Sequence, residues 1–97
     1  MEIEFANKKL EQLIDDEPAH WLPVSVISSA RRKLQLIDAA KDERDLRNWK
    51  SLHYEKLSRD KTLSSIRLNK NWRMILFLSK RHNESKVKIL SIEDYHS

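Results

Sequence analysis

Residues 66–78, "IRLNKNWRMILFL", have the pattern of a β-hairpin, two apolar strands joined by a polar turn. Two arginines, Arg67 and Arg73, flank that turn in the most apolar part of the chain. Whether they face the same side depends on the length of the turn, because a slip of one residue inverts the faces of a strand. The direction of these two side chains is therefore the first question that the sequence raises.

A three-residue loop at 69–71 is the register that sorts the side chains best. It places the large apolar residues on one face, which helices can cover: Ile66, Leu68, Trp72, Met74 and Leu76. The other face then carries Ser65, Arg67, Arg73, Ile75 and Phe77. A two-residue loop would instead mix Arg73 into the apolar face. We therefore predict the three-residue loop, in which an asparagine can take the left-handed conformation usually left to glycine.

This register sets Arg67 directly opposite Arg73, and like charges directly opposite on a sheet are destabilising. An uncompensated pair beside Ile75 and Phe77, which we expect to be exposed, favours an anionic ligand at this place. The alternative is that an Asp or Glu from elsewhere in the chain neutralises the arginines.

The sequence before the hairpin predicts one strand and two to three helices. Ile3 and Phe5 alternate with glutamates, as in a short strand. Asn7 can cap a first helix, with Leu10, Leu13 and Ile14 on one face. Pro23 suits the first turn of a second helix that reaches about Lys41. Its apolar stripe is Ile27, Ala30, Leu34 and Ile37. Asp42 can cap a short third helical turn.

The rest of the chain predicts strands at 52–57, 64–68, 72–78 and 87–92, with a loop at 79–86. The fold class is therefore α+β, a single domain over residues 1–97. We expect an antiparallel sheet of four to five strands, mixed at the N-terminal strand, with two to three helices packed on one face.

The amino-acid composition excludes several classes of function. The chain has no cysteine, which excludes disulfides, thiolate metal sites and a cysteine nucleophile, and suits a reducing cytoplasm. No apolar run has membrane-spanning length, and no metal-ligand spacing is present. Residues 1–17 carry two Lys against six Asp or Glu, a net charge of −4, so residues 18–97 carry a net charge of +8 and the whole chain +4. Such a basic body fits a polyanion binder, or serves solubility alone.

Four segments resemble the HigB branch of the RelE-type toxins of bacterial toxin–antitoxin systems. They are "ARRKLQLIDAAKDERDLRN", "SLHYEKL", "SIRLNKNWRMIL" and the C-terminal "SIEDYH", and the similarity covers roughly residues 24–96. The resemblance implies a RelE-like fold and a ribosome-dependent mRNA endonuclease that cuts the codon in the ribosomal A site without cofactor or metal. It also implies a cytoplasmic bacterial protein, held inactive by a cognate HigA-like helix-turn-helix antitoxin. Operator DNA would be bound only through the toxin–antitoxin complex.

The functional positions of the family are matched here by His53, Lys56, Arg67, Arg73, Asp94, Tyr95 and His96. Arg73 is the expected stabiliser of the transition state, because arginine presents two parallel donors to a phosphate. His53 and His96 are the acid and base candidates, in an order left open. Without the family match, a histidine so near the terminus is more often a frayed surface residue.

Two further groups complete the expected RNA-binding surface. Tyr95, Tyr54 and Phe77 can stack on bases, and Asp94 can orient His96 or Arg73. Arg31, Arg32 and Lys33 lie on a basic helix face that we expect to contact ribosomal RNA phosphates.

The chain departs from its relatives at two places. The turn at 58–61 is shorter and lacks glycine, and Ser64 stands where relatives often carry an aromatic residue. Both departures support the alternative of a degenerate toxin that binds antitoxin or RNA without cutting. A free-standing basic nucleic-acid binder is a third, weaker alternative.

Overall fold

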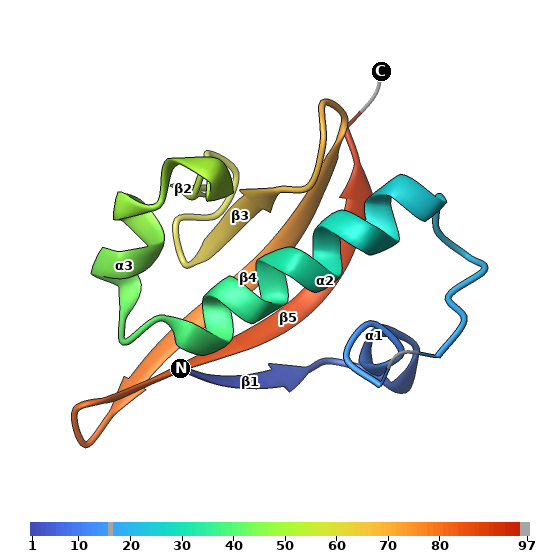
Figure 1. The fold of residues 1–97 in the computed structure, drawn as a ribbon. Helices are drawn as coiled ribbons and strands as arrows, with labels where there is room; N and C mark the ends of the chain where they lie inside the picture. Colours follow the sequence, from blue (N-terminus) through green and yellow to red (C-terminus); the bar gives the residue numbers. More distant parts are fainter. Residues whose placement is uncertain (16, 96–97) are drawn as a thin grey trace.

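The structure, a computed structural model, describes residues 1–15 and 17–95. The strands are β1 (Glu2–Phe5), β2 (Glu55–Lys56), β3 (Leu63–Arg67), β4 (Trp72–Arg81) and β5 (Glu84–Asp94). The helices are α1 (Lys8–Glu11), α2 (Val24–Ala39), α3 (Glu43–Asn48) and the short 3-10 helix η1 (Lys50–Leu52). The strands form one sheet in the order β1-β5-β4-β3-β2 (Figure 1). Because only β1 runs parallel to its neighbour, the predicted mixed α+β sheet is confirmed.

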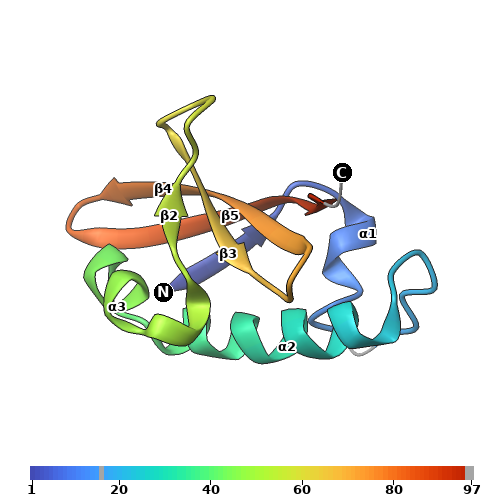
Figure 2. The same ribbon diagram turned by 90° about the horizontal axis from the view of Figure 1, so that it is seen from above.

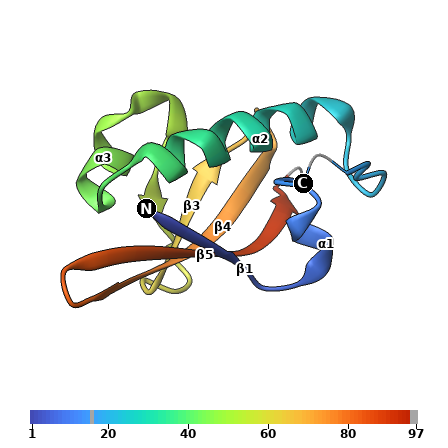
Figure 3. The ribbon, with the colours of Figure 1, turned by 60° about the horizontal axis from the view of Figure 1, so that its bottom comes forward.

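Helix α2 lies along one side of the sheet, with α3 and α1 near its two ends (Figures 2 and 3). Its buried side chains recur at helical spacing: Val26, Ala30, Leu34 and Ile37. They meet the apolar face of the hairpin, where Ile66, Met74 and Leu76 are each 0% exposed. The predicted stripe is right apart from Ile27, which is only partly buried while Val26 takes its place.

The short helices begin where the sequence predicted. Asn7 accepts a hydrogen bond from the Leu10 backbone through its side chain, and Asp42 accepts one from the Arg44 backbone, so each caps its helix. The first helix ends after only one turn, however, and Ile14 beyond it is 54% exposed rather than buried.

The strand predicted at 52–57 is wrong over its first half. Lys50–Leu52 forms η1, and His53 follows in the left-handed conformation with φ of 47°. Only Glu55–Lys56 pairs with β3. A left-handed residue turns the chain out of an extended path, so the strand cannot start before it.

The loop predicted at 79–86 is also wrong, because β4 and β5 continue as a polar two-stranded ribbon. His82 and Asn83 form its two-residue turn with φ of 52° and 67°. Two consecutive positive φ values are what a tight hairpin turn requires, and here they are supplied without glycine. The ribbon strands are rich in Lys, Arg, Ser and Glu, so apolar alternation gave no sign of them.

Candidate functional site

The predicted register of the central hairpin is confirmed. Arg67 pairs directly with Arg73 across β3 and β4, and the Leu68 amide donates to the Trp72 carbonyl at 2.9 Å. The loop is closed by the Asn69 side chain, whose Oδ1 accepts from the amides of Asn71 and Trp72, both at 2.9 Å. The expected left-handed asparagine is absent from this loop, since within the described residues only His53, His82 and Asn83 have positive φ.

The sheet gathers polar side chains on the side that the helices leave open. Strand pairing aligns Glu55 with Ser65, Arg67 with Arg73, and Arg73 with Glu93. We call this surface the arginine face and define it by Glu55, Ser65, Arg67, Arg73, Ser91 and Glu93 together with Arg59 and Tyr95. Four strands thus supply neighbouring groups from sequence positions almost 40 apart.

Among the charged side chains that form ion pairs on the arginine face, that of Arg73 is the least exposed. Its side chain is 16% exposed, and its Nη1 lies 3.5 Å from Glu55 Oε1. The Tyr95 ring packs over the guanidinium, with 5.7 Å between Cζ and the ring centre. Glu55 is 62% exposed, so the neutralisation considered from the sequence comes from a solvent-exposed carboxylate, and an exposed ion pair contributes little to stability.

The arginine face also concentrates unsatisfied hydrogen-bonding groups. Within residues 1–15 and 17–95, three buried side-chain atoms have no hydrogen-bond partner: Ser65 Oγ, Arg67 Nε and Arg73 Nη1. All three belong to neighbouring positions on β3 and β4. Within this part of the chain Arg73 Nη1 has only its ion pair with the exposed Glu55. Buried polar groups are nearly always hydrogen-bonded in folded proteins, so this cluster of donors indicates a place for an incoming acceptor.

The connection between β2 and β3 projects from the sheet on the side away from α2 (Figure 2). Its Arg59 reaches Glu93 of β5 with Nη2 3.3 Å from Oε1, and Ser91 donates to the same carboxylate at 2.8 Å. Arg59 therefore spans β3 and β4. Ile75, which pairs with Ser65 and Ser91, is 1% exposed, which corrects the expectation that it would be exposed; Phe77 is exposed as expected.

A shallow pocket of about 340 Å³ opens at this face. It is lined by Glu55, Lys56, Leu57, Ser58, Arg59, Ser65 and Tyr95. The altered turn at 58–61 closes without glycine, because Asp60 Oδ1 accepts from both the amide and the hydroxyl of Thr62. These hydrogen bonds also lower the pKa of Asp60. The shortened turn therefore shapes the pocket rather than disrupting it.

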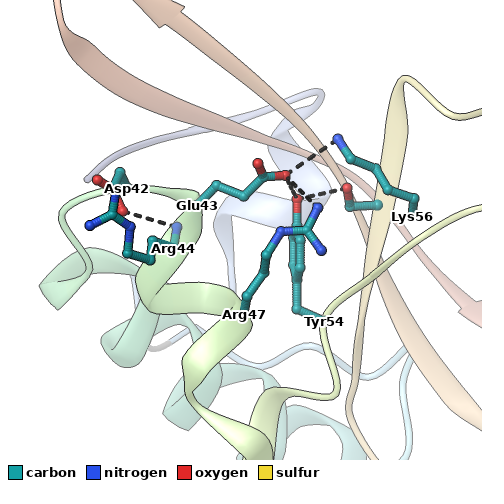
Figure 4. A network of polar contacts seen from close by, with 7 residues as sticks. Asp42, Glu43, Arg44, Arg47, Tyr54 and Lys56 are labelled. Carbon is teal, nitrogen blue, oxygen red and sulfur yellow. Dashed lines mark hydrogen bonds and ion pairs between the residues drawn. The ribbon is translucent and has the colours of Figure 1, made fainter.

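Lys56 points away from the two arginines. It pairs in register with Ser64 on the helix-covered side, and its Nζ lies 3.3 Å from Glu43 Oε2 of α3. Glu43 also accepts a hydrogen bond of 2.6 Å from the Tyr54 hydroxyl, which lies 2.9 Å from the Ser64 hydroxyl (Figure 4). Lys56 is therefore anchored to α3 at the rim of the pocket and does not lie beside the two arginines.

This network also reassigns Tyr54. Burial and then the hydrogen bond to Glu43 raise the pKa of Tyr54 to about 12. The same hydrogen bond, followed by Lys56, lowers the pKa of Glu43. Tyr54 thus links α3 to the sheet, and Arg47 lies over its partly buried ring, with 5.2 Å between Cζ and the ring centre. Ser64 is 1% exposed on that same side, so an aromatic residue at position 64 would not point toward the arginine face.

The remaining expected residues fall in three places. Tyr95 lies on the arginine face, and its amide donates to the Asn71 carbonyl at 2.6 Å. Asp94 pairs in register with Trp72 and so alternates to the opposite side from Glu93. His53 is exposed at the end of η1 and does not line the pocket. His96 lies outside the described residues.

Only part of the basic face of α2 is exposed for the expected contacts with RNA phosphates. Arg31 donates to the carbonyls of Gln12, Leu13 and Glu17, which corrects its expected role as a free phosphate contact. Lys33 Nζ donates to the Ser51 carbonyl at 2.9 Å, and burial together with Arg32 lowers the pKa of Lys33. Arg32 itself is exposed, as predicted.

Sequence reasoning placed Ser65 on this face correctly but missed Glu55, Arg59, Ser91 and Glu93 as members of it. Strand alternation could have found Glu55 and Glu93, because each sits at an even spacing from a residue already assigned. Arg59 could not be found in this way, since its position depends on how the 58–61 turn folds.

Among the described residues, none of the helices is both long and apolar enough to cross a membrane.

The fold is shared with bacterial toxins of known structure. The YoeB/ParE toxin from Agrobacterium tumefaciens superposes with a TM-score of 0.60 at 10% identity, covering 99% of this chain and 100% of that one. The YoeB dimer from Staphylococcus aureus superposes with a TM-score of 0.56 at 22% identity, covering 100% and 98%. The chain therefore has the fold of these two toxin structures.

Sequence comparison gives the family within that class. The family described as "RelE-like toxin of type II toxin-antitoxin system HigB" matches residues 3–96. Toxin HigB-1 of Vibrio cholerae serotype O1 (strain ATCC 39315 / El Tor Inaba N16961) is 42% identical over 77 residues, covering 77% of this chain and 81% of that toxin. The chain belongs to the HigB family and is the toxin of a type II toxin–antitoxin system, so it has an antitoxin as partner.

Proposed function

We propose that this toxin is an endoribonuclease that cuts mRNA in the ribosomal A site by metal-free acid–base chemistry. The observation that carries the proposal is the arginine pair. Arg67 and Arg73 face each other, and each has a buried N–H without a hydrogen-bond partner. The phosphate of an RNA chain is an acceptor that fits such donors in charge and in geometry.

In the proposed reaction the 2′-oxygen attacks the adjacent phosphorus while a base takes its proton. The bond from phosphorus to the 5′-oxygen breaks, an acid protonates that oxygen, and a 2′,3′-cyclic phosphate remains. Arg73 and Arg67 stabilise the extra negative charge on the phosphoryl oxygens. The need for a 2′-hydroxyl also explains selectivity for RNA over DNA.

The proton transfers have three candidates. Glu55 lies at the rim beside Arg73, so its carboxylate can accept the 2′-hydroxyl proton of an RNA bound there. His53 and His96 keep their expected acid and base roles as part of the proposal. Tyr95 and Phe77, both partly exposed on the helix-free side, supply stacking surfaces for bases.

Two features that would favour a degenerate toxin have structural explanations. The short turn at 58–61 is closed by Asp60 and carries Arg59 onto the arginine face. Ser64 lies on the other side of β3, where it joins Tyr54. Neither change removes a group from the arginine face, so catalysis is favoured over a purely binding role.

The remaining partners follow from this proposal. A helix-turn-helix antitoxin of the HigA type would hold the toxin inactive, and the pair would bind operator DNA. The toxin would act in the bacterial cytoplasm, where translating ribosomes are. Exposed Arg32 and Arg44 on the helices would add salt-dependent contacts to ribosomal RNA.

The test is to induce the toxin without its antitoxin and to map mRNA 5′ ends. We expect growth arrest with new cuts inside translated codons for the wild type, and neither effect for Arg73→Ala. Arg81→Ala is the matched control, because Arg81 lies on the same strand but at the exposed end of the ribbon. Intact translated messages under wild-type induction would overturn the proposal.

A further inference from the structure

Ser65 is a buried residue whose hydroxyl has no use within the described part of the chain. It is 0% exposed, and its Oγ has no hydrogen-bond partner among residues 1–15 and 17–95. It also lines the pocket on the arginine face. A hydroxyl that is lost from water and left unpaired is a cost to the fold, which calls for an explanation.

The position of Ser65 supplies one. It lies two residues before Arg67 on β3, so both side chains point to the same face about 6.6 Å apart along the strand. A phosphate group can fill such a gap, because it accepts hydrogen bonds of about 2.8 Å on opposite sides. Ser65 Oγ, Arg67 Nε and Arg73 Nη1 would then be satisfied together by one tetrahedral anion.

Glu55 occupies the approach to these donors. It pairs in register with Ser65, and its carboxylate lies 3.5 Å from Arg73 Nη1. At 62% exposure Glu55 loses little by turning out into water, since exposed ion pairs contribute little to stability. Its carboxylate therefore stands where an anionic ligand would bind, and it can be displaced.

We propose that Ser65, Arg67 and Arg73 form a three-donor phosphate cradle in which Glu55 is the exchangeable counter-ion. Ser65 is then a ligand residue, and Glu55 leaves Arg73 when the phosphate enters. The identification of that phosphate as part of an RNA chain rests on the proposed function. Binding of an inorganic phosphate to the cradle does not.

The chain offers a matched control one residue away. Ser64 is a buried serine on the same strand, but it faces the other side and its hydroxyl already meets Tyr54 at 2.9 Å. Ser64→Ala should weaken the fold and leave phosphate affinity unchanged. Ser65→Ala should weaken phosphate binding without weakening the fold, because it removes a donor that has no partner in the protein without phosphate.

The experiment is a titration of the purified full chain with inorganic phosphate, followed through the Nε–H resonances of Arg67 and Arg73 by NMR. We expect both resonances to shift in the wild type. Ser65→Ala should weaken binding about 3- to 10-fold, the effect of one neutral hydrogen bond. Glu55→Gln should strengthen binding by a similar factor, because it removes the competing charge.

Unchanged phosphate affinity in Ser65→Ala, weaker binding in Glu55→Gln, or no shift in the wild type would each overturn the cradle. Should Ser65→Ala fail to fold, Ser65→Cys keeps the test, since a thiol of similar size is a weak donor and should weaken binding too. An mRNA cleavage assay separates the two proposals. Cleavage with unaltered phosphate affinity in Ser65→Ala refutes the cradle alone, whereas a responsive cradle without cleavage refutes the proposed function alone.

Discussion

Arg67 and Arg73 lie directly opposite each other on β3 and β4, and they alternate with Ile66 and Met74, which pack in the core against α2. Directly opposed like charges cost a sheet roughly 0.2–1 kcal/mol. The arginine pair therefore lowers the stability of the fold. Such local costs are common where a protein has to bind a ligand, here one of opposite charge.

Replacing Arg67 by glutamine should separate stability from activity. We expect the free energy of unfolding to stay the same or rise by up to about 1 kcal/mol, because the repulsion is relieved. Cleavage of translated mRNA should fall about 10²–10³-fold, the usual effect of removing one preorganised donor. Urea denaturation and mapping of mRNA ends measure the two quantities. Arg81→Gln should change neither, and a less stable but fully active Arg67→Gln would contradict this account.

The hydroxyl of Tyr54 should make stability depend on pH in the alkaline range. An unfolded tyrosine ionises near pH 10, whereas the pKa of Tyr54 in the fold is raised to about 12. Between these values the unfolded state releases a proton that the folded state keeps, so the free energy of unfolding falls as pH rises. Below about pH 10 the contribution of Tyr54 is complete.

This dependence can be isolated, because the chain has two tyrosines. In a Tyr95→Phe background, Tyr54 is the only phenol, and its ionisation is followed by ultraviolet absorbance. Adding Tyr54→Phe should lower the free energy of unfolding at neutral pH by about 1.5–3 kcal/mol, through loss of a hydrogen bond to a carboxylate. The difference between the two variants should shrink from pH 10 to 12. A constant difference over that range would show that Tyr54 does not titrate there.

The sequence predicted the parts of the fold where apolar residues alternate along a strand, and it failed where the strands are polar or the backbone is left-handed. Apolar alternation found the hairpin register, since only one register puts Leu68, Trp72 and Met74 on the same side. The same reasoning failed at the β4–β5 ribbon, whose polar strands carry no such signal. It also failed at His53, where a left-handed residue ends η1 and delays the strand.

The candidate site divides in the same way. The arginines were predictable, because their direction follows from strand periodicity alone. Lys56, Tyr54 and Arg31 were misplaced, because each is held by a partner distant in sequence that no local pattern reveals. Glu43 lies 13 residues from Lys56, and the Glu17 carbonyl lies 14 from Arg31. Such polar pairings become visible only once the helices are docked on the sheet.

Arg31 and Arg32 are neighbours that should behave differently. Arg31 donates to three backbone carbonyls of the segment after α1, so Arg31→Ala should cost about 1.5–3 kcal/mol of stability. Arg32 is exposed, so Arg32→Ala should leave stability within about 0.5 kcal/mol. Its effect should appear instead in ribosome binding, as a smaller slope of affinity against salt concentration. Equal effects of both variants on the salt slope would contradict the assignment of Arg31 as a structural residue.

The side chains at positions 54 and 64 should share one space in the fold, so that a larger residue at one position requires a smaller residue at the other. Their hydroxyls lie 2.9 Å apart on the helix-covered side, where Ser64 is 1% exposed. Ser64→Trp introduces an aromatic residue at this position, and against Tyr54 it should destabilise the fold by about 1–3 kcal/mol through overpacking. Tyr54→Ala alone should also destabilise, by leaving a cavity and an unpaired Glu43.

The double variant tests whether the two side chains share that space. If they do, Ser64→Trp with Tyr54→Ala should be more stable than the sum of the single changes, by about 1 kcal/mol or more. Ser64→Trp with Tyr95→Ala is the control. It should be additive, because Tyr95 packs over Arg73 on the opposite side of the sheet. Urea denaturation of the single and double variants supplies both cycles. Additive energies for positions 54 and 64 would mean that Tyr54 and an aromatic residue at position 64 do not compete for the same space.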